Sequence, residues 1–124
     1  MAAPNIGSTA SAVYLRMAAG PVATTTGTNA TLIVSCGSTS STVLRVTRLD
    51  IANIDATNAA DISILRFSGT NSTTIVSTVS VPADAVLRVY DDYGSLSVVE
   101  GQDIRAIASA ANDLTFDAEY QEFT

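Results

Sequence analysis

The C-terminal quarter of the chain alternates apolar and polar residues with a period of two, on both sides of a short polar turn. The apolar positions are Ile104, Ala106 and Ala108 before the turn, and Leu114, Phe116, Ala118 and Tyr120 after it. This alternation is typical of antiparallel strands with one buried and one solvated face. We therefore predict a closing β-hairpin over residues 99–123, with both apolar faces on the same side of one sheet.

Two loop lengths fit this predicted hairpin. A three-residue loop places Ala108 opposite Phe116, and a five-residue loop places Ala108 opposite Leu114. On the polar face, Arg105 then pairs with Glu119 in the first register or with Asp117 in the second. We predict that residues 114, 116, 118 and 120 close the core, and that Asp117, Glu119 and Arg105 form a charged ladder outside it.

The rest of the chain consists of short strand-like runs separated by polar turns. They cover residues 13–17, 31–36, 42–54, 61–67, 73–81, 85–90 and 95–99. In the longest run the apolar positions change parity between Val46 and Leu49, which predicts a β-bulge near Thr47 and Arg48. The four residues 81–84 (VPAD) predict a type I turn, joining the strands on either side into a hairpin.

No segment has a clear helical period, so the predicted fold class is all-β. We expect a single antiparallel β-sandwich of about eight strands, either jelly-roll or immunoglobulin-like. The chain has 124 residues, enough for one core. Residues 13–124 are predicted to form the β-sandwich domain. Residues 1–12 are small and polar, with Ile6 as their one anchor, and are predicted to form an N-terminal arm, as a loose tail or ordered against a neighbouring subunit.

Missing residue types exclude several kinds of chemistry. The chain has no His and no Lys, which excludes imidazole acid–base catalysis, Schiff-base lysines and phosphate-loop lysines. Cys36 is the single cysteine, so neither an intrachain disulfide nor a cysteine zinc site can form. We therefore expect no enzyme activity, no catalytic residue, no cofactor and no metal.

The charge balance also restricts the partners. A net charge of −6 makes non-specific binding of nucleic acid or of anionic membranes unfavourable. No apolar run approaches the roughly 18–20 residues of a membrane span, and residues 1–7 lack the pattern of a secretory signal. We expect a protein made in the cytoplasm.

Two acidic groupings are weighed as calcium sites. One is Asp91 with Asp92, and the other is Asp55 with Asn58 and Asp61. Calcium needs six to eight oxygen ligands, and acidic residues are common in turns between strands. We interpret both groupings as solvated turn carboxylates.

Arginine recurs in the middle of predicted strands, with apolar neighbours. These residues are Arg16, Arg45, Arg66, Arg88 and Arg105. Arginine at such positions either keeps an exposed strand face soluble through pairing with an acid, or contacts another subunit. The candidate subunit-contact residues are Ile6, Arg16, Arg45, Arg66, Arg88 and Tyr93. The weakly charged strands 13–17 and 31–36 are further places where another copy could pair.

Several stretches of the sequence resemble one family of proteins. They are LDIANIDATNAADIS at residues 49–63, VPADAVLRV at 81–89, LSVVEGQDIR at 96–105, ASAANDLT at 108–115 and EYQEF at 119–123. In this order they resemble small virion structural proteins of tailed bacteriophages. The resemblance covers about residues 42–123, and departs from the family pattern at Val99 and Gln102, where that pattern carries acids.

The resemblance implies a non-enzymatic building block of a phage particle, located in the virion. The first expectation is a capsid decoration (cement) protein, whose partner is the major capsid protein or another virion protein. The alternatives are a neck, tail or head-fibre component and, from another class, a carbohydrate- or receptor-binding β-sandwich. A homo-oligomer is expected, with a trimer as one form it could take.

Overall fold

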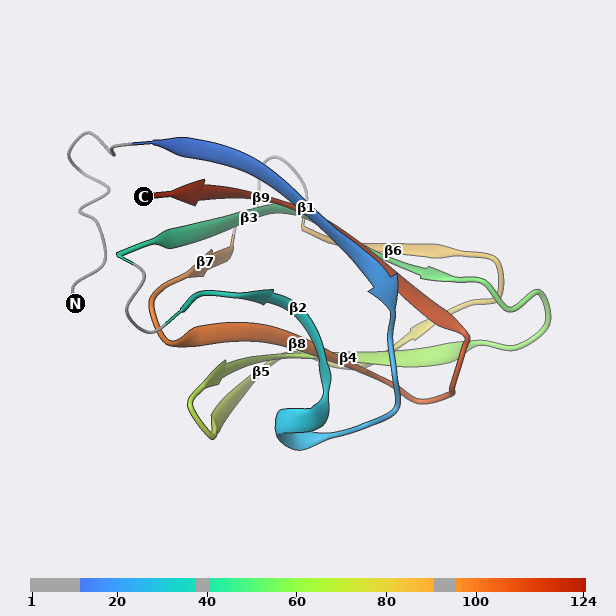
Figure 1. Ribbon diagram of the computed structural model, residues 1–124. Helices are drawn as coiled ribbons and strands as arrows, with labels where there is room; N and C mark the ends of the chain where they lie inside the picture. The colour runs from blue at the N-terminus through green and yellow to red at the C-terminus, as the bar shows by residue number, and fades with distance from the viewer. Residues whose placement is uncertain (1–11, 38–40, 91–95) are drawn as a thin grey trace.

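The computed structural model describes residues 12–37, 41–90 and 96–124, which form two antiparallel sheets packed face to face (Figure 1). Their elements are β1 (Val13–Pro21), the 3-10 helix η1 (Gly27–Asn29), β2 (Thr31–Ser35), β3 (Val43–Asn53), β4 (Ala60–Ser68), β5 (Asn71–Val81), β6 (Val86–Tyr90), β7 (Leu96–Val98), β8 (Gln102–Ala108) and β9 (Leu114–Phe123). Each predicted strand is present. The predicted fold class, an all-β sandwich, is confirmed.

The order of the strands identifies the topology. One sheet, here called the β1 sheet, has the order β1-β9-β3-β6, with β7 also paired to β3; the other, the β2 sheet, has the order β2-β8-β4-β5. The antiparallel pairs β1·β9, β2·β8, β3·β6 and β4·β5 therefore alternate between the two sheets. A chain wound in this way, as a folded double ribbon, is a jelly roll. This order selects the jelly roll from the two expected topologies.

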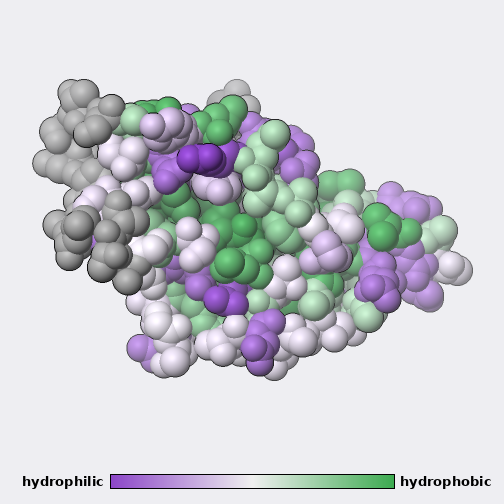
Figure 2. All heavy atoms as spheres, viewed as in Figure 1, coloured by the Kyte–Doolittle hydropathy of each residue, from purple (hydrophilic) through white to green (hydrophobic). Residues whose placement is uncertain are grey.

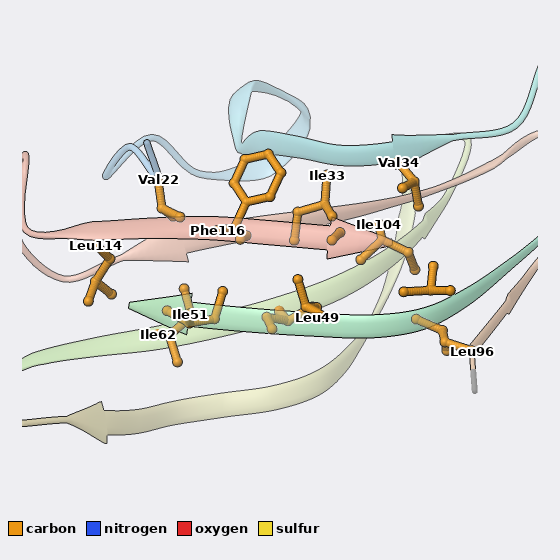
Figure 3. Packing of buried hydrophobic residues seen from close by; sticks show 14 of the residues in the cluster. Val22, Ile33, Val34, Leu49, Ile51, Ile62, Leu96, Ile104, Leu114 and Phe116 are labelled. Atoms are coloured by element: carbon orange, nitrogen blue, oxygen red, sulfur yellow. The ribbon is translucent and has the colours of Figure 1, made fainter. Parts of the chain in front are cut away.

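The core lies between the sheets and takes residues from both. Leu49, Ile51 and Phe116 reach it from the β1 sheet, and Ile62 and Ile104 from the β2 sheet (Figure 3). All five are at most 6 % exposed. Burying each such side chain contributes roughly 1.5–3 kcal/mol, so this layer dominates the stability of the sandwich.

The predicted contribution of the last strand to the core is confirmed for three of its four residues. Leu114, Phe116 and Ala118 are buried. Tyr120 is partly buried and packs against the core cluster.

The predicted closing hairpin is wrong. β8 pairs with β2 and β4, whereas β9 pairs with β1 and β3, so Ala108 lies opposite Ile62 and Phe116 lies opposite Gly20 and Ile51. Both proposed registers fail for the same reason. The apolar faces of the two strands do meet the same core, but they meet it from opposite sheets.

The hairpin predicted around Pro82 is wrong too. β5 pairs with β4 in the β2 sheet, and β6 pairs with β3 in the β1 sheet, so this connection also crosses between sheets. The amide of Ala85 donates a hydrogen bond to the carbonyl of Pro82 at 3.1 Å. The turn therefore spans residues 82–85, one residue later than expected, and its third residue, Asp84, has a φ of 57°. A positive φ at that position does not fit the predicted type I turn.

The predicted β-bulge in the longest strand is confirmed. The pairing of β3 with β9 shifts between Val46 and Arg48, and the hydroxyl of Thr47 donates to the carbonyl of Glu119 at 3.3 Å. The extra residue keeps Val46 and Leu49 both in the core. It also brings Arg48 to the outer face of the sheet, on the same side as Arg45.

The two ends of the described sandwich meet. The amide of Ala12 donates to the carbonyl of Thr124, and the amide of Thr124 donates to the carbonyl of Ala12, both at 3.0 Å. Of the predicted N-terminal arm, residues 1–11, with Ile6, lie outside the described residues.

Candidate interaction surface

The two strands predicted as places for pairing with another copy are edge strands. β1 forms one edge of its sheet and β2 one edge of the other. Within the described part of the chain, β1 pairs with β9 on one side and with no strand on the other. Its second side is an open edge.

The open edge carries large apolar side chains that water reaches. Val13 is 54 % exposed, Leu15 67 % and Met17 72 %. The three alternate along the strand, so they share its outer face, opposite Phe123, Gln121 and Glu119 of β9. In the space-filling view, hydrophobic residues are visible at the surface over β1 (Figure 2). We call Val13, Leu15 and Met17 the apolar row.

The other face of β1 carries an aromatic and charged pair. The Arg16 Nε atom donates to Glu122 Oε2 on β9 at 2.9 Å. The guanidinium carbon of Arg16 lies 5.3 Å from the centre of the Tyr14 ring, within the range of a cation–π contact. The one charge on this stretch of β1 is therefore balanced by an acid of the same sheet.

Next to the apolar row, the outer face of the β1 sheet carries a network of five charged residues. Arg48 contacts Asp50 at 2.8 Å, Glu119 at 3.0 Å and Asp117 at 3.3 Å. Arg88 contacts Asp50 from β6, with Nε 2.8 Å from Oδ1 and Nη2 3.1 Å from Oδ2. Two arginines thus join three strands through three acids, and we call this the charge network.

Asp50 and Arg48 are the least exposed members of the charge network, with 14 % and 21 % of their side chains accessible. Hydrogen bonds from Arg88 hold the pKa of the Asp50 carboxyl below its usual range, with a further contribution from Arg48, although burial opposes this shift. Hydrogen bonds to Glu119 and Asp50 raise the pKa of the Arg48 guanidinium. Both groups therefore stay charged, and the network holds β3, β6 and β9 together.

The predicted subunit-contact arginines do not form one site. Arg16, Arg45 and Arg88 all lie on the β1 sheet, but Arg66 lies on β4 of the other sheet, where its Nη1 donates to Gln102 Oε1 at 3.0 Å. Tyr93 lies outside the described residues. Arg48 is not among the contact residues predicted from the sequence, although the predicted bulge beside it places it on the outer face.

The predicted outer ladder is wrong in one of its three members. Asp117 and Glu119 do line the outer face of the β1 sheet, but their cation is Arg48. Arg105 lies in the β2 sheet, where it pairs with Asp103 at 3.1 Å and donates to the carbonyls of Thr28 and Ala30. Arg105 therefore fastens the loop before β2 to β8.

In the acidic loop considered as a calcium site, backbone amides of the loop itself bond to the Asp55 carboxylate. The Asp55 Oδ1 atom accepts the amides of Thr57 at 2.7 Å and Asn58 at 3.1 Å, and these bonds lower the pKa of Asp55. The described residues hold no group of three or more side chains suited to a metal ion. Asp91 and Asp92 lie outside them.

A search for pockets and comparisons with known proteins add no further candidate site among the described residues. No pocket is found in the part of the chain that the structure describes, and no helix there is long and apolar enough to cross a membrane. Comparisons with protein families, with curated proteins and with solved structures gave no match.

Proposed function

We propose that this protein is a non-enzymatic virion structural protein of a tailed bacteriophage, most specifically a capsid decoration protein that binds and stabilises the head shell. One structural observation carries the proposal that it works by assembly. The open edge of β1 presents the apolar row, whose three side chains are each more than half exposed.

Such an edge is unusual for a protein that works alone. Sheet proteins commonly protect an edge strand with charges, a proline in the strand or a covering segment, because unpaired backbone groups recruit other strands. The proline of β1, Pro21, is its last residue; from Val13 to Met17 the strand has one charged residue, Arg16, and Glu122 already pairs with it. An edge that is apolar and electrically balanced favours contact with protein.

The sequence resemblance to phage virion proteins supports a virion as the place where this assembly occurs. It covers about residues 42–123, which include β3 to β9. The jelly roll is compatible with it, since capsid domains are among the proteins that use this fold. Fold alone does not imply function, so the virion assignment depends on the resemblance and the open edge together. The proposed partners are further copies of this chain and the major capsid protein.

The deciding experiment locates the chain in the particle. Cryo-electron microscopy of virions should show this protein in many copies on the head lattice. Particles that lack it should release their DNA at a lower temperature, and purified protein added back should restore the original temperature. A chain found at the neck, the tail or a head fibre, or present in a few copies, would overturn the decoration role and leave those virion positions. A chain absent from virions would overturn the whole proposal.

A carbohydrate-binding module is the second candidate, since lectins also use the jelly roll. Glycan-array binding by the purified protein, lost on substitution of the exposed Tyr14, would favour it. The thermal release of DNA with and without the protein separates the two candidates, because a glycan-binding module has no reason to strengthen the shell.

A further inference from the structure

We propose that two copies of the chain pair antiparallel along β1, with Leu15 of each copy at the two-fold axis. The pairing would join the two β1 sheets into one continuous sheet. The pairing rests on the proposed assembly role and specifies how one of its partners, another copy of this chain, binds. It depends on the geometry of β1 and not on the location of the protein in a virion.

The hydrogen bonds at both ends of β1 show which backbone groups face the open edge. The amides of Ala12 and Val22 donate to the carbonyls of Thr124 and Leu114, at 3.0 and 2.9 Å. The register of β1 with β9 runs between these pairs without a shift. Because hydrogen-bonded and non-hydrogen-bonded residues alternate in an antiparallel pair, the even-numbered residues bond to β9. The amides and carbonyls of Val13, Leu15 and Met17 therefore point outward.

The same three residues thus provide both the unpaired backbone groups and the apolar row. With Leu15 on the axis, Leu15 faces Leu15 of the second copy, and Val13 faces Met17. All of these are hydrogen-bonded pairs, as the outward backbone groups require. The exposed apolar side chains of each copy then cover those of the other on one face of the joined sheet.

The other face fits in the same register. Tyr14 comes opposite Arg16 of the second copy in a non-hydrogen-bonded pair, where side chains approach most closely. Within one copy, Arg16 already lies 5.3 Å from the ring of Tyr14, and the second copy would add the same kind of contact across the axis. Glu122, the neighbour of Tyr14 on β9, places a negative charge near the incoming guanidinium.

Neighbouring registers lose these contacts. If the two-fold axis is moved by one residue, from Leu15 to Arg16, the two Arg16 guanidinium groups lie directly opposite each other. A slip of two, to Met17, sets Leu15 against Ala19 and Val13 against Pro21, which has no amide to donate. The axis at Leu15 is the one that combines apolar contacts, outward hydrogen bonds and the Tyr14–Arg16 pair.

Sedimentation velocity on the full-length protein over a range of concentrations tests the pairing. The wild-type protein should reach a reversible dimer, and Leu15→Glu should raise its dissociation constant about tenfold or more. Val86→Glu is the matched control: Val86 is 63 % exposed on β6, at the other side of the same sheet, and its substitution should leave the dimer unchanged. Circular dichroism should show that both variants keep the wild-type sheet signal, since neither residue is in the core.

Cross-linking tests the register. A short bifunctional maleimide should join two Leu15→Cys chains, and should not join two Ala19→Cys chains, whose cysteines would be about 26 Å apart. Preferential cross-linking of Met17→Cys would overturn the register. A wild-type monomer up to the solubility limit, a trimer, or a dimer disrupted by Val86→Glu and not by Leu15→Glu would overturn the pairing. Those results leave the virion location untouched, whereas a β1 dimer of a protein absent from virions would overturn the proposed function alone.

Discussion

Arg88 on β6 donates two hydrogen bonds to the carboxylate of Asp50 on β3, from Nε to Oδ1 at 2.8 Å and from Nη2 to Oδ2 at 3.1 Å. The two residues are direct cross-strand partners. Asp50 receives a third contact from Arg48, which itself contacts two acids of β9. The Asp50 carboxylate therefore adds side-chain contacts to the backbone pairing of β6 with β3 at the centre of the sheet.

Replacing Asp50 should make stability less dependent on pH. The pKa of Asp50 is lowered in the folded state from 3.8, so its contribution is complete above about pH 5 and is lost as the pH falls through the lowered folded value. Asp50→Asn should reduce the free energy of unfolding at pH 7 by about 1–2 kcal/mol. The difference from wild type, followed by urea denaturation, should shrink below pH 4. A double-mutant cycle with Arg88→Gln measures the coupling, and a coupling of zero would contradict a role for the pair.

Substitution of Phe116 should be among those that lower the free energy of unfolding most. It comes from β9, is 6 % exposed and packs in the core between the two sheets. Phe116→Ala should lower the free energy of unfolding by about 3–5 kcal/mol, through lost burial and the cavity left behind. Val86→Ala, at an exposed position, should change it by less than about 0.5 kcal/mol. Equal effects of the two substitutions in thermal melts would mean that Phe116 does not pack as described.

Two glycines should respond in opposite ways to alanine. A Cβ at Gly20 would lie 3.6 Å from the Phe116 ring, an ordinary contact, and Gly20 has no positive φ. Gly20→Ala should therefore be neutral or stabilise by up to about 1 kcal/mol, because it restricts the unfolded chain. Gly69, between β4 and β5, has open space around it but a φ of 64°, so Gly69→Ala should cost about 1–2 kcal/mol. Chemical denaturation of both variants checks the contrast, and a larger loss at Gly20 would refute it.

Asn53 should be the most sensitive buried polar residue. It is 3 % exposed; its Nδ2 donates to the carbonyls of Asn58 and Val81, both at 2.9 Å, and its Oδ1 accepts the amide of Asp55 at 2.9 Å. Asn53→Ala should cost about 2–4 kcal/mol, since it leaves three backbone groups without this partner.

Asn53→Asp sharpens that test. It turns the donor into a second acceptor facing two carbonyls, and should be at least as damaging at pH 7 but partly recover at low pH, when the new carboxyl is protonated. Asn58→Ala is the control, because its exposed side chain makes one weak contact, 3.4 Å from Asp55. Unfolding curves in which Asn53→Ala and Asn58→Ala coincide would show that the Asn53 bonds carry little energy.

The positions of the strands, and which face of most strands is buried, follow from the sequence. Period-two alternation placed Leu114, Phe116 and Ala118 in the core, and the change of parity after Val46 located the bulge. These predictions succeed because neighbouring side chains of a strand point to opposite faces, a local property of the backbone. The contacts of the charge network do not follow from local sequence patterns. Arg48 meets Glu119 across 71 positions of the sequence, and nothing local indicates that contact.

The tertiary structure alone decided which sheet each strand joins. The apolar faces of β8 and β9 look the same in sequence whether they lie side by side in one sheet or face each other across the core, because burial is satisfied in both arrangements. In the jelly-roll order the two faces lie opposite each other across the core. The same order places Arg105 and Glu119 in different sheets and puts β1 at an open edge. The period-two alternation in the sequence determined an all-β chain, and the order of the strands in the two sheets determined where its apolar row is exposed to water.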